Sequence, residues 1–111
     1  MPPRDRVRIL HMIDACEQAI SFADDRTHDD LVDDMLFRFA MIHAVLIVLE
    51  AASQVSAATR AETPQIAWAP MIGMRNRVVH AYFDIDLDTI WSTVHEDFPP
   101  LLTALRQLTA E

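Results

Sequence analysis

Apolar residues recur at intervals of three and four along most of the chain, which is the spacing of amphipathic helices. The first such stripe, within residues 4–22, consists of Val7, Leu10, His11 or Met12, Cys16 and Ile20. The last stripe is interrupted by Pro99 and Pro100, which kink or restart its helix. Strand-type alternation is hard to find anywhere in the sequence. The pattern predicts an all-α, up-down bundle of about four to five helices.

Residues 31–53 form the most hydrophobic segment, and on a helix their apolar side chains point all the way round. We expect a central helix that packs on the rest of the monomer on one side and on a second subunit on another, because so small a domain cannot wrap it completely. Arg38, His43 and Glu50 interrupt the segment, so we interpret it as a core helix and expect no membrane partner.

Glu50 is the polar residue of this helix with the most specific predicted partner. Buried carboxylates are rarely left unpaired, so we hypothesise that Glu50 pairs with Arg75 or with His43. The alternative is that Glu50 only caps or solvates the end of the helix.

The second half of the chain divides into a connection and capped helices. Residues 54–67 are polar and lack periodicity, so they are predicted to be a connection. A helix is expected to begin at residues 68–70, with Pro70 in its first turn. Residues 84–88 carry three Asp residues that end this helix and cap the next one. The apolar face of that next helix is predicted to consist of Leu87, Ile90, Trp91, Val94 and Phe98.

Composition and charge narrow the class of protein. The 111 residues fit a single domain, 1–111, and 51% of them are hydrophobic. A net charge of −8 and the lack of any Lys argue against tight non-specific binding of nucleic acid, so no DNA partner is expected. An RNA substrate would be held by few contacts at a local basic site, or the chain would engage a basic partner. The lone Cys16 in an apolar stripe and the lack of a secretory signal favour the cytoplasm.

Several catalytic classes are excluded by the same sequence. Gly73 is the only glycine, so there is no phosphate-cradling glycine loop, and no Gly-x-Ser-x-Gly elbow is present. The Asp-rich residues 24–34 are predicted to be a solvated helix start, with a metal site as the weaker alternative. We therefore predict no metal and no cofactor.

The chemistry of the chain is concentrated in residues 74–83, where Arg75, His80 and Tyr82 interrupt an apolar helical pattern. Arg binds phosphate through two N–H groups at once, and His can accept or donate a proton near neutral pH. On one regular helix Arg75 and His80 lie about 140° apart. Either the Arg side chain curls round, or the helix loosens, or two copies meet across a two-fold axis, which we favour. The structural alternative is a buried Arg75 ion pair, a solvated His80 and a core Tyr82.

These residues carry a resemblance that extends over residues 31–105 and is densest around the motif. The motif is Arg75-x4-His80-x-Tyr82, with Trp68-x5-Met74 before it and Phe83-Asp84-Ile85-Asp86 after it. It resembles the HepT-like toxin subunits of the HEPN superfamily, small helical proteins paired with a MntA-type nucleotidyltransferase antitoxin. Glu50 followed by Ala51 also matches a Glu-Ala pair of that family, although Leu49 stands where the family often has Gly.

The resemblance implies a two-fold dimer with the activity of a metal-independent endoribonuclease toxin, type VII-like, with tRNA among its candidate substrates. His80 would transfer the proton as a ribose 2′-hydroxyl attacks the adjacent phosphate, and Arg75 would stabilise the developing charge. Asn76 would orient His80 or bind phosphate, and Arg77 would contact the RNA backbone. The antitoxin would silence the toxin by attaching AMP to Tyr82.

Two rival functions remain open at this point. The chain could be a non-catalytic helical dimer that binds a nucleotide or serves as the structural subunit of a nucleotidyltransferase complex, which the acidic balance favours. It could also be a plain interaction domain in which the motif is dispensable.

Overall fold

The computed structural model describes residues 1–80 and 84–110, and these residues contain helices and no strand, which confirms the all-α prediction. The elements are α1 (Pro3–Ala23), α2 (His28–Asp33), α3 (Met35–Gln54), α4 (Ala57–Glu62), α5 (Trp68–His80), α6 (Leu87–Ser92), the π-helix η2 (Thr93–Asp97) and α7 (Phe98–Thr109).

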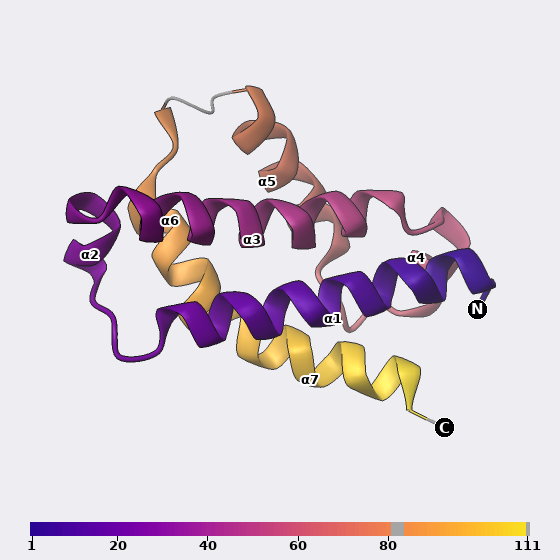
Figure 1. The fold of residues 1–111 in the computed structure, drawn as a ribbon. Helices are drawn as coiled ribbons and strands as arrows, with labels where there is room; N and C mark the ends of the chain where they lie inside the picture. The colour runs from indigo at the N-terminus through magenta and orange to yellow at the C-terminus, as the bar shows by residue number, and fades with distance from the viewer. Residues whose placement is uncertain (81–83, 111) are drawn as a thin grey trace.

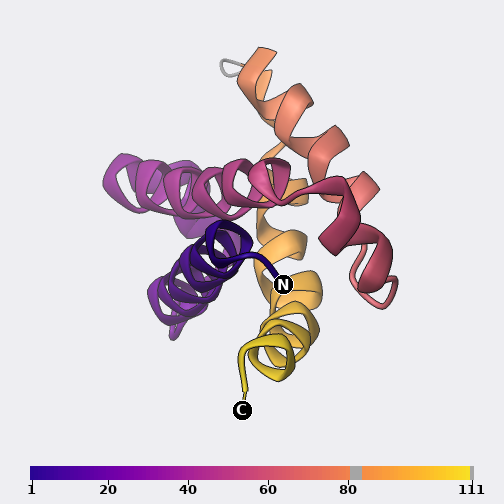
Figure 2. The same ribbon diagram turned by 90° about the vertical axis from the view of Figure 1, so that its right-hand side faces the viewer.

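The two longest helices, α1 and α3, lie side by side and run in opposite directions (Figure 1). Helix α7 packs on α1, whereas α5 packs on α3 on the side away from α1 (Figure 2). The segment formed by α6 and η2 passes from the α5 side of the molecule to the α7 side. The site helix α5 is therefore attached to the bundle mainly through α3.

The core lies between α1, α3 and the segment from α6 to α7. Helix α1 is fully buried at Ile9, Met12, Cys16 and Ala19, each with 0% exposure. The stripe predicted for this helix is wrong in part, because Val7 and Leu10 are 48% and 40% exposed. Of the apolar face predicted for the helix after residues 84–88, Ile90, Val94 and Phe98 are each 1% exposed, and Leu87 and Trp91 are half-buried against the core. Burial raises the pKa of the Cys16 thiol to about 12.

One face of α3 stays uncovered within the monomer. Leu36 and Phe39 are 81% and 49% exposed, while Met41, Val45 and Val48 on the opposite side are fully buried. By length and composition α3 could cross a membrane, but half of it is buried in the protein, and the core helix of a soluble bundle meets the same criteria. The incomplete covering of α3 agrees with the expectation from its sequence, and the second subunit stays a prediction.

The single helix predicted over residues 31–53 is wrong at its start, because α2 ends at Asp33 and α3 begins at Met35, with Asp34 between them. Asp34 has extended backbone (φ −112°, ψ 101°), and its carboxylate accepts a hydrogen bond from the N–H of Phe37 at 3.1 Å. Arg26 holds this carboxylate at 2.7 Å and that of Asp30 at 3.1 Å. The acidic stretch thus starts helices, as predicted, but it starts two of them.

The connection predicted over residues 54–67 is also wrong in part, because it contains α4. Ser56 caps α4 by accepting from the N–H of Thr59 at 3.3 Å. The Asp5 carboxylate of α1 accepts from the Ser56 N–H (3.0 Å), the Ser56 hydroxyl (2.6 Å) and the Thr59 hydroxyl (2.5 Å). Asp5 is only 2% exposed, and these bonds hold its pKa below the usual range. A buried, satisfied carboxylate therefore ties α4 to α1.

Candidate active site

Helix α5 begins where the sequence predicts, at Trp68, with Pro70 in its first turn. The indole N–H of Trp68 donates to the hydroxyl of Thr63 at 2.9 Å, and this fixes the start of the helix. Met74 and Val78, one turn apart, are buried, and α5 packs on α3. The anchored end and the buried face together set the orientation of α5 on α3.

This orientation brings Arg75 of α5 onto Glu50 of α3. The Nε of Arg75 donates to Oε2 of Glu50 at 2.7 Å, and one Nη donates to Oε1 at 3.4 Å, so the contact is a two-bonded fork. The other Nη donates to Oδ1 of Asn76 at 3.1 Å. The hypothesis that Glu50 pairs with Arg75 is confirmed, and His43, the alternative partner, is exposed.

The pair is accessible rather than buried, since the side chains of Arg75 and Glu50 are 30% and 44% exposed. Hydrogen bonding to Arg75 lowers the pKa of Glu50, and the same bond raises the pKa of Arg75. Both groups are therefore charged at neutral pH. Glu50 holds the guanidinium in one orientation while leaving part of it open to an approaching phosphate.

Arg77 does not join this group. It is exposed and lines two cavities between α5 and the α6–η2–α7 segment, whereas Arg75 reaches α3. Two residues on one helix separated by a single position point about 160° apart, which accounts for the separation. The structure therefore places Arg77 away from the Arg75–Glu50 pair, and the contact of Arg77 with an RNA backbone stays a prediction.

The remaining motif residues lie at the edge of the described structure. Helix α5 extends to His80, but the His80 side chain lies outside the described residues, as does Tyr82. The site therefore consists, in its described part, of Glu50, Arg75 and Asn76. The roles predicted for His80 and Tyr82 stay predictions.

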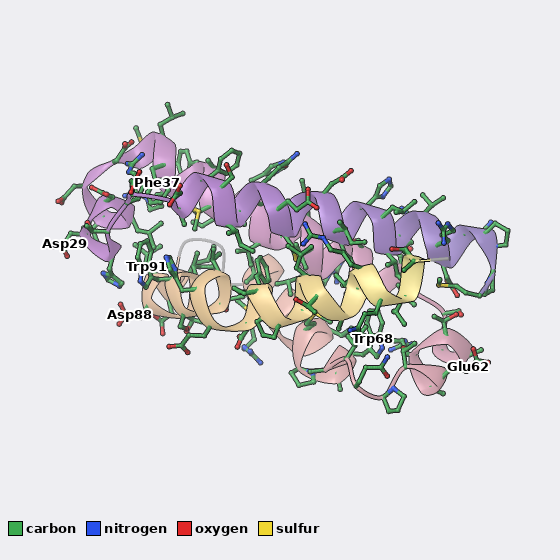
Figure 3. The ribbon with its side chains drawn as sticks, turned by 90° about the horizontal axis from the view of Figure 1, so that it is seen from below. Asp29, Phe37, Glu62, Trp68, Asp88 and Trp91 are labelled. Carbon is green, nitrogen blue, oxygen red and sulfur yellow. The ribbon has the colours of Figure 1, made fainter. Side chains whose placement is uncertain are left out.

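A second polar cluster lies at the α2 end of the molecule, where Figure 3 shows Asp88 and Trp91, far from Trp68. His28 of α2 pairs with Asp88 of α6 and meets Trp91 edge-on, with ring centroids 5.9 Å apart. The ring of His95 also packs on this tryptophan, with ring centroids 3.9 Å apart and an angle of 30° between the ring planes. No sequence signal could find this cluster, because His28 and Asp88 are 60 positions apart. Among the described residues no three His, Cys, Asp or Glu side chains come together to hold a metal ion.

The described part of the chain is thus a small all-α domain in which Arg75 of the motif helix α5 forms a forked pair with Glu50 of α3. The chain belongs to the ribonuclease HepT-like family, whose model matches residues 12–108. The resemblance given by the motif is thereby confirmed.

Individual relatives agree with the family assignment. A Methanocaldococcus jannaschii protein named "Putative RNase" is 30% identical over 91% of this chain and 94% of its own length. A Thermococcus cleftensis protein named "Probable ribonuclease HepT" is 34% identical over 79% of this chain and 80% of its own length. A Caldanaerobacter subterraneus protein, also named "Putative RNase", is 24% identical over 93% of this chain and 92% of its own length. No solved structure gives a significant match to the chain.

Proposed function

We propose that this protein is a metal-independent endoribonuclease and the toxin of a type VII-like pair with a nucleotidyltransferase antitoxin. The observation that carries the proposal is the Arg75–Glu50 fork, an oriented and accessible guanidinium on the helix that bears the HepT-like motif. Membership of a family described as ribonucleases, and relatives named as RNases, support the same activity.

In the proposed reaction the 2′-hydroxyl of a ribose attacks the adjacent phosphorus while the bond to the 5′-oxygen breaks. His80 takes the hydroxyl proton or returns one to the leaving oxygen. Arg75 stabilises the charge on the phosphoryl oxygens, and Glu50 keeps its guanidinium from rotating away. Asn76, already bonded to Arg75, offers its amide N–H groups to the phosphate or to His80. No step uses a metal ion.

The uncovered face of α3 supports the proposal of a two-fold dimer. Leu36, Phe39, His43 and Ile47 form a stripe of exposed or half-exposed residues at intervals of three and four that leads to Glu50. A second copy on this stripe would cover its apolar side chains and bring two Glu50–Arg75 pairs towards one cleft. Phe39→Asp should convert the dimer to a monomer in sedimentation equilibrium, whereas an unchanged mass would contradict this interface.

Regulation is proposed to act on Tyr82, by transfer of AMP from ATP to its phenol oxygen by the partner nucleotidyltransferase, with release of pyrophosphate. The adduct adds negative charge and bulk next to the motif, which would exclude an RNA phosphate. Intact mass should show one AMP on the wild type and none on Tyr82→Phe. An adduct on Tyr82→Phe, or an unchanged wild-type mass, would overturn this part.

A non-catalytic role is the second candidate, because Glu50 already neutralises much of Arg75 and the chain carries a net charge of −8. In that case the motif would bind a nucleotide or hold an assembly together.

The deciding experiment is cleavage of total cellular RNA by the purified protein in EDTA, beside His80→Ala with confirmed folding. The proposed activity predicts cleavage by the wild type and a loss of about 10²–10⁴-fold in the variant. A folded, AMP-free dimer that cleaves nothing would favour the non-catalytic subunit.

A further inference from the structure

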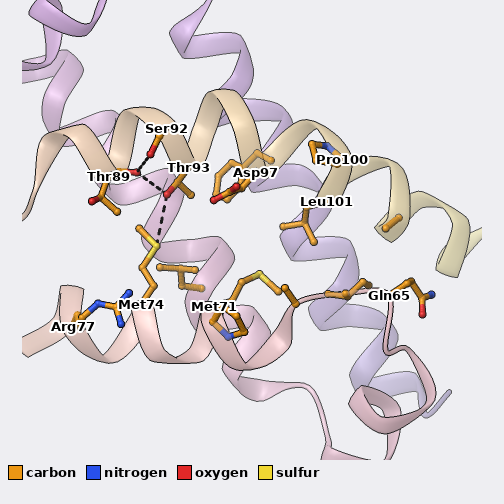
Figure 4. Close-up of a pocket in the computed structure, with 16 residues that line it drawn as sticks. Gln65, Met71, Met74, Arg77, Thr89, Ser92, Thr93, Asp97, Pro100 and Leu101 are labelled. Atoms are coloured by element: carbon orange, nitrogen blue, oxygen red, sulfur yellow. Dashed lines mark hydrogen bonds between the residues drawn. The ribbon is translucent and has the colours of Figure 1, made fainter.

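A groove runs between α5 and the α6–η2–α7 segment, along the face of α5 that carries Arg77. It consists of two adjoining cavities of about 510 and 520 Å³, which share Met74, Arg77 and Thr89. Figure 4 shows the residues that line the cavity of about 510 Å³. Met71, Met74 and Arg77 lie on one wall, and Thr93, Asp97 and Leu101 lie on the other.

The surface inside the groove is mainly apolar. At its base the hydroxyl of Thr93 lies 3.8 Å from the sulfur of Met74 and joins the two walls, and the π-helix η2 forms part of one wall. π-Helical turns are frequent at functional sites, since they open the regular helix ladder. The apolar lining comes from Leu49, Ile66, Met71, Phe98, Leu101 and Ala104.

The rim of the groove is acidic. Asp97 lines one cavity, Asp84 and Asp86 line the other, and Arg77 lies where the two meet. Asp86 is occupied as the cap of α6, where it accepts from the N–H groups of Asp88 and Thr89. Among the described side chains, Asp84 and Asp97 have no hydrogen bond or ion pair and are exposed. Their charges are open to a cationic neighbour.

We propose that this groove docks a polypeptide segment of a partner protein, with apolar side chains on one face and Lys or Arg along its edges. The apolar lining would receive the apolar face, and Asp84 and Asp97 would pair with the basic edges. Arg77, between the two cavities, would donate to a main-chain carbonyl of the segment. An anionic ligand fits less well, because carboxylates outnumber the single Arg in the groove and the chain itself carries −8.

The docking proposal does not rest on ribonuclease activity, because the groove contains neither Glu50 nor Arg75. It is tested with a labelled helical peptide of about 18 residues that has Leu on one face and Lys on the other. Its counterpart with Glu in place of Lys is the charge control. Asp97→Lys is compared with Glu96→Lys, which reverses a neighbouring exposed charge of η2 outside the groove.

We expect the Leu/Lys peptide to bind and to shift the amide resonances of Thr89, Ser92 and Leu101. Asp97→Lys should weaken binding about tenfold and Glu96→Lys less than about twofold, as measured by fluorescence anisotropy at fixed salt. The proposal is overturned by equal weakening in both variants, by equal binding of the Leu/Glu peptide, or by resonance changes at Leu36 and Phe39 instead. The proposal is also overturned if the peptide does not bind at about 1 mM. It is overturned as well if a second copy of this chain covers the groove and protects the same amides from hydrogen exchange.

Discussion

The bundle core and the site helix α5 differ in how far neighbouring helices cover them. In the core, α1 packs on both α3 and α7, and even the buried charge of Asp5 has its hydrogen-bond partners. Helix α5 packs mainly on α3, faces a groove on another side and keeps its charged side chains accessible. Of the candidate site residues, Arg75 and Asn76 lie on α5, and Glu50 reaches them from α3. Substitutions in the two regions should therefore affect different properties.

The largest effect on stability should come from Phe98→Ala in the core. Phe98 is 1% exposed, so removing its ring leaves a cavity, and the free energy of unfolding should fall by about 3–5 kcal/mol. Urea denaturation measures this change. Phe39→Ala is the matched control, because Phe39 is 49% exposed and its loss should cost less than about 1 kcal/mol in the monomer. Equal losses would mean that the core is not where the structure places it.

An intermediate effect is expected from Asp5→Asn. The amide cannot replace all three charge-assisted acceptor contacts, so unfolding free energy should fall by about 1–3 kcal/mol at pH 7. Asp14→Asn, at an exposed position of the same helix, should change it little.

The Asp5 contribution should also depend on pH. The folded-state pKa of Asp5 lies below its ordinary value of 3.8, so the ionised form stabilises the fold. The stabilisation is fully present above that ordinary value and is lost as pH falls through the lower folded-state pKa. Denaturation series from pH 7 downwards should show the wild type and Asp5→Asn converging in acid, and a constant difference would contradict the assignment.

The smallest effect on stability should come from Glu50→Gln at the site. The Arg75–Glu50 pair is partly solvated, and such pairs add little to folding, so the melting temperature should move by less than about 4 °C. Differential scanning fluorimetry measures it. A large drop would show that the pair is part of the structural core.

The bundle could be predicted from the sequence where side chains repeat with helical spacing. The helix α1 follows from that spacing, although its buried face is shifted so that Val7 and Leu10 are exposed. The start of α5 follows from Pro70 in its first turn, and the uncovered face of α3 follows from its apolar side chains all the way round. The break at Asp34 and the short helix α4 could not be predicted with it, because both depend on hydrogen bonds. Arg26 reaches Asp34 across eight positions, and Asp5 reaches Ser56 across 51.

The candidate site was predictable in the same uneven way. The Glu50–Arg75 pair follows from the need of a helix carboxylate for a partner, and the structure confirms it. The separation of Arg77 from Arg75 follows from helix geometry, but its position in a groove depends on where α6 and η2 lie. The positions of α6 and η2 depend on tertiary packing, so the motif residues alone could not predict the groove.

The most direct test of the functional assignment compares two arginines that each form a surface ion pair. Arg75 pairs with Glu50, and Arg106 pairs with Glu17 at 2.8 Å on the opposite side of the bundle from α5. RNA cleavage in EDTA is measured for Arg75→Ala and Arg106→Ala, with melting temperatures for both. The account predicts that only Arg75→Ala loses cleavage, by about 10²–10³-fold, at a similar melting temperature. Undiminished cleavage by a folded Arg75→Ala would contradict it.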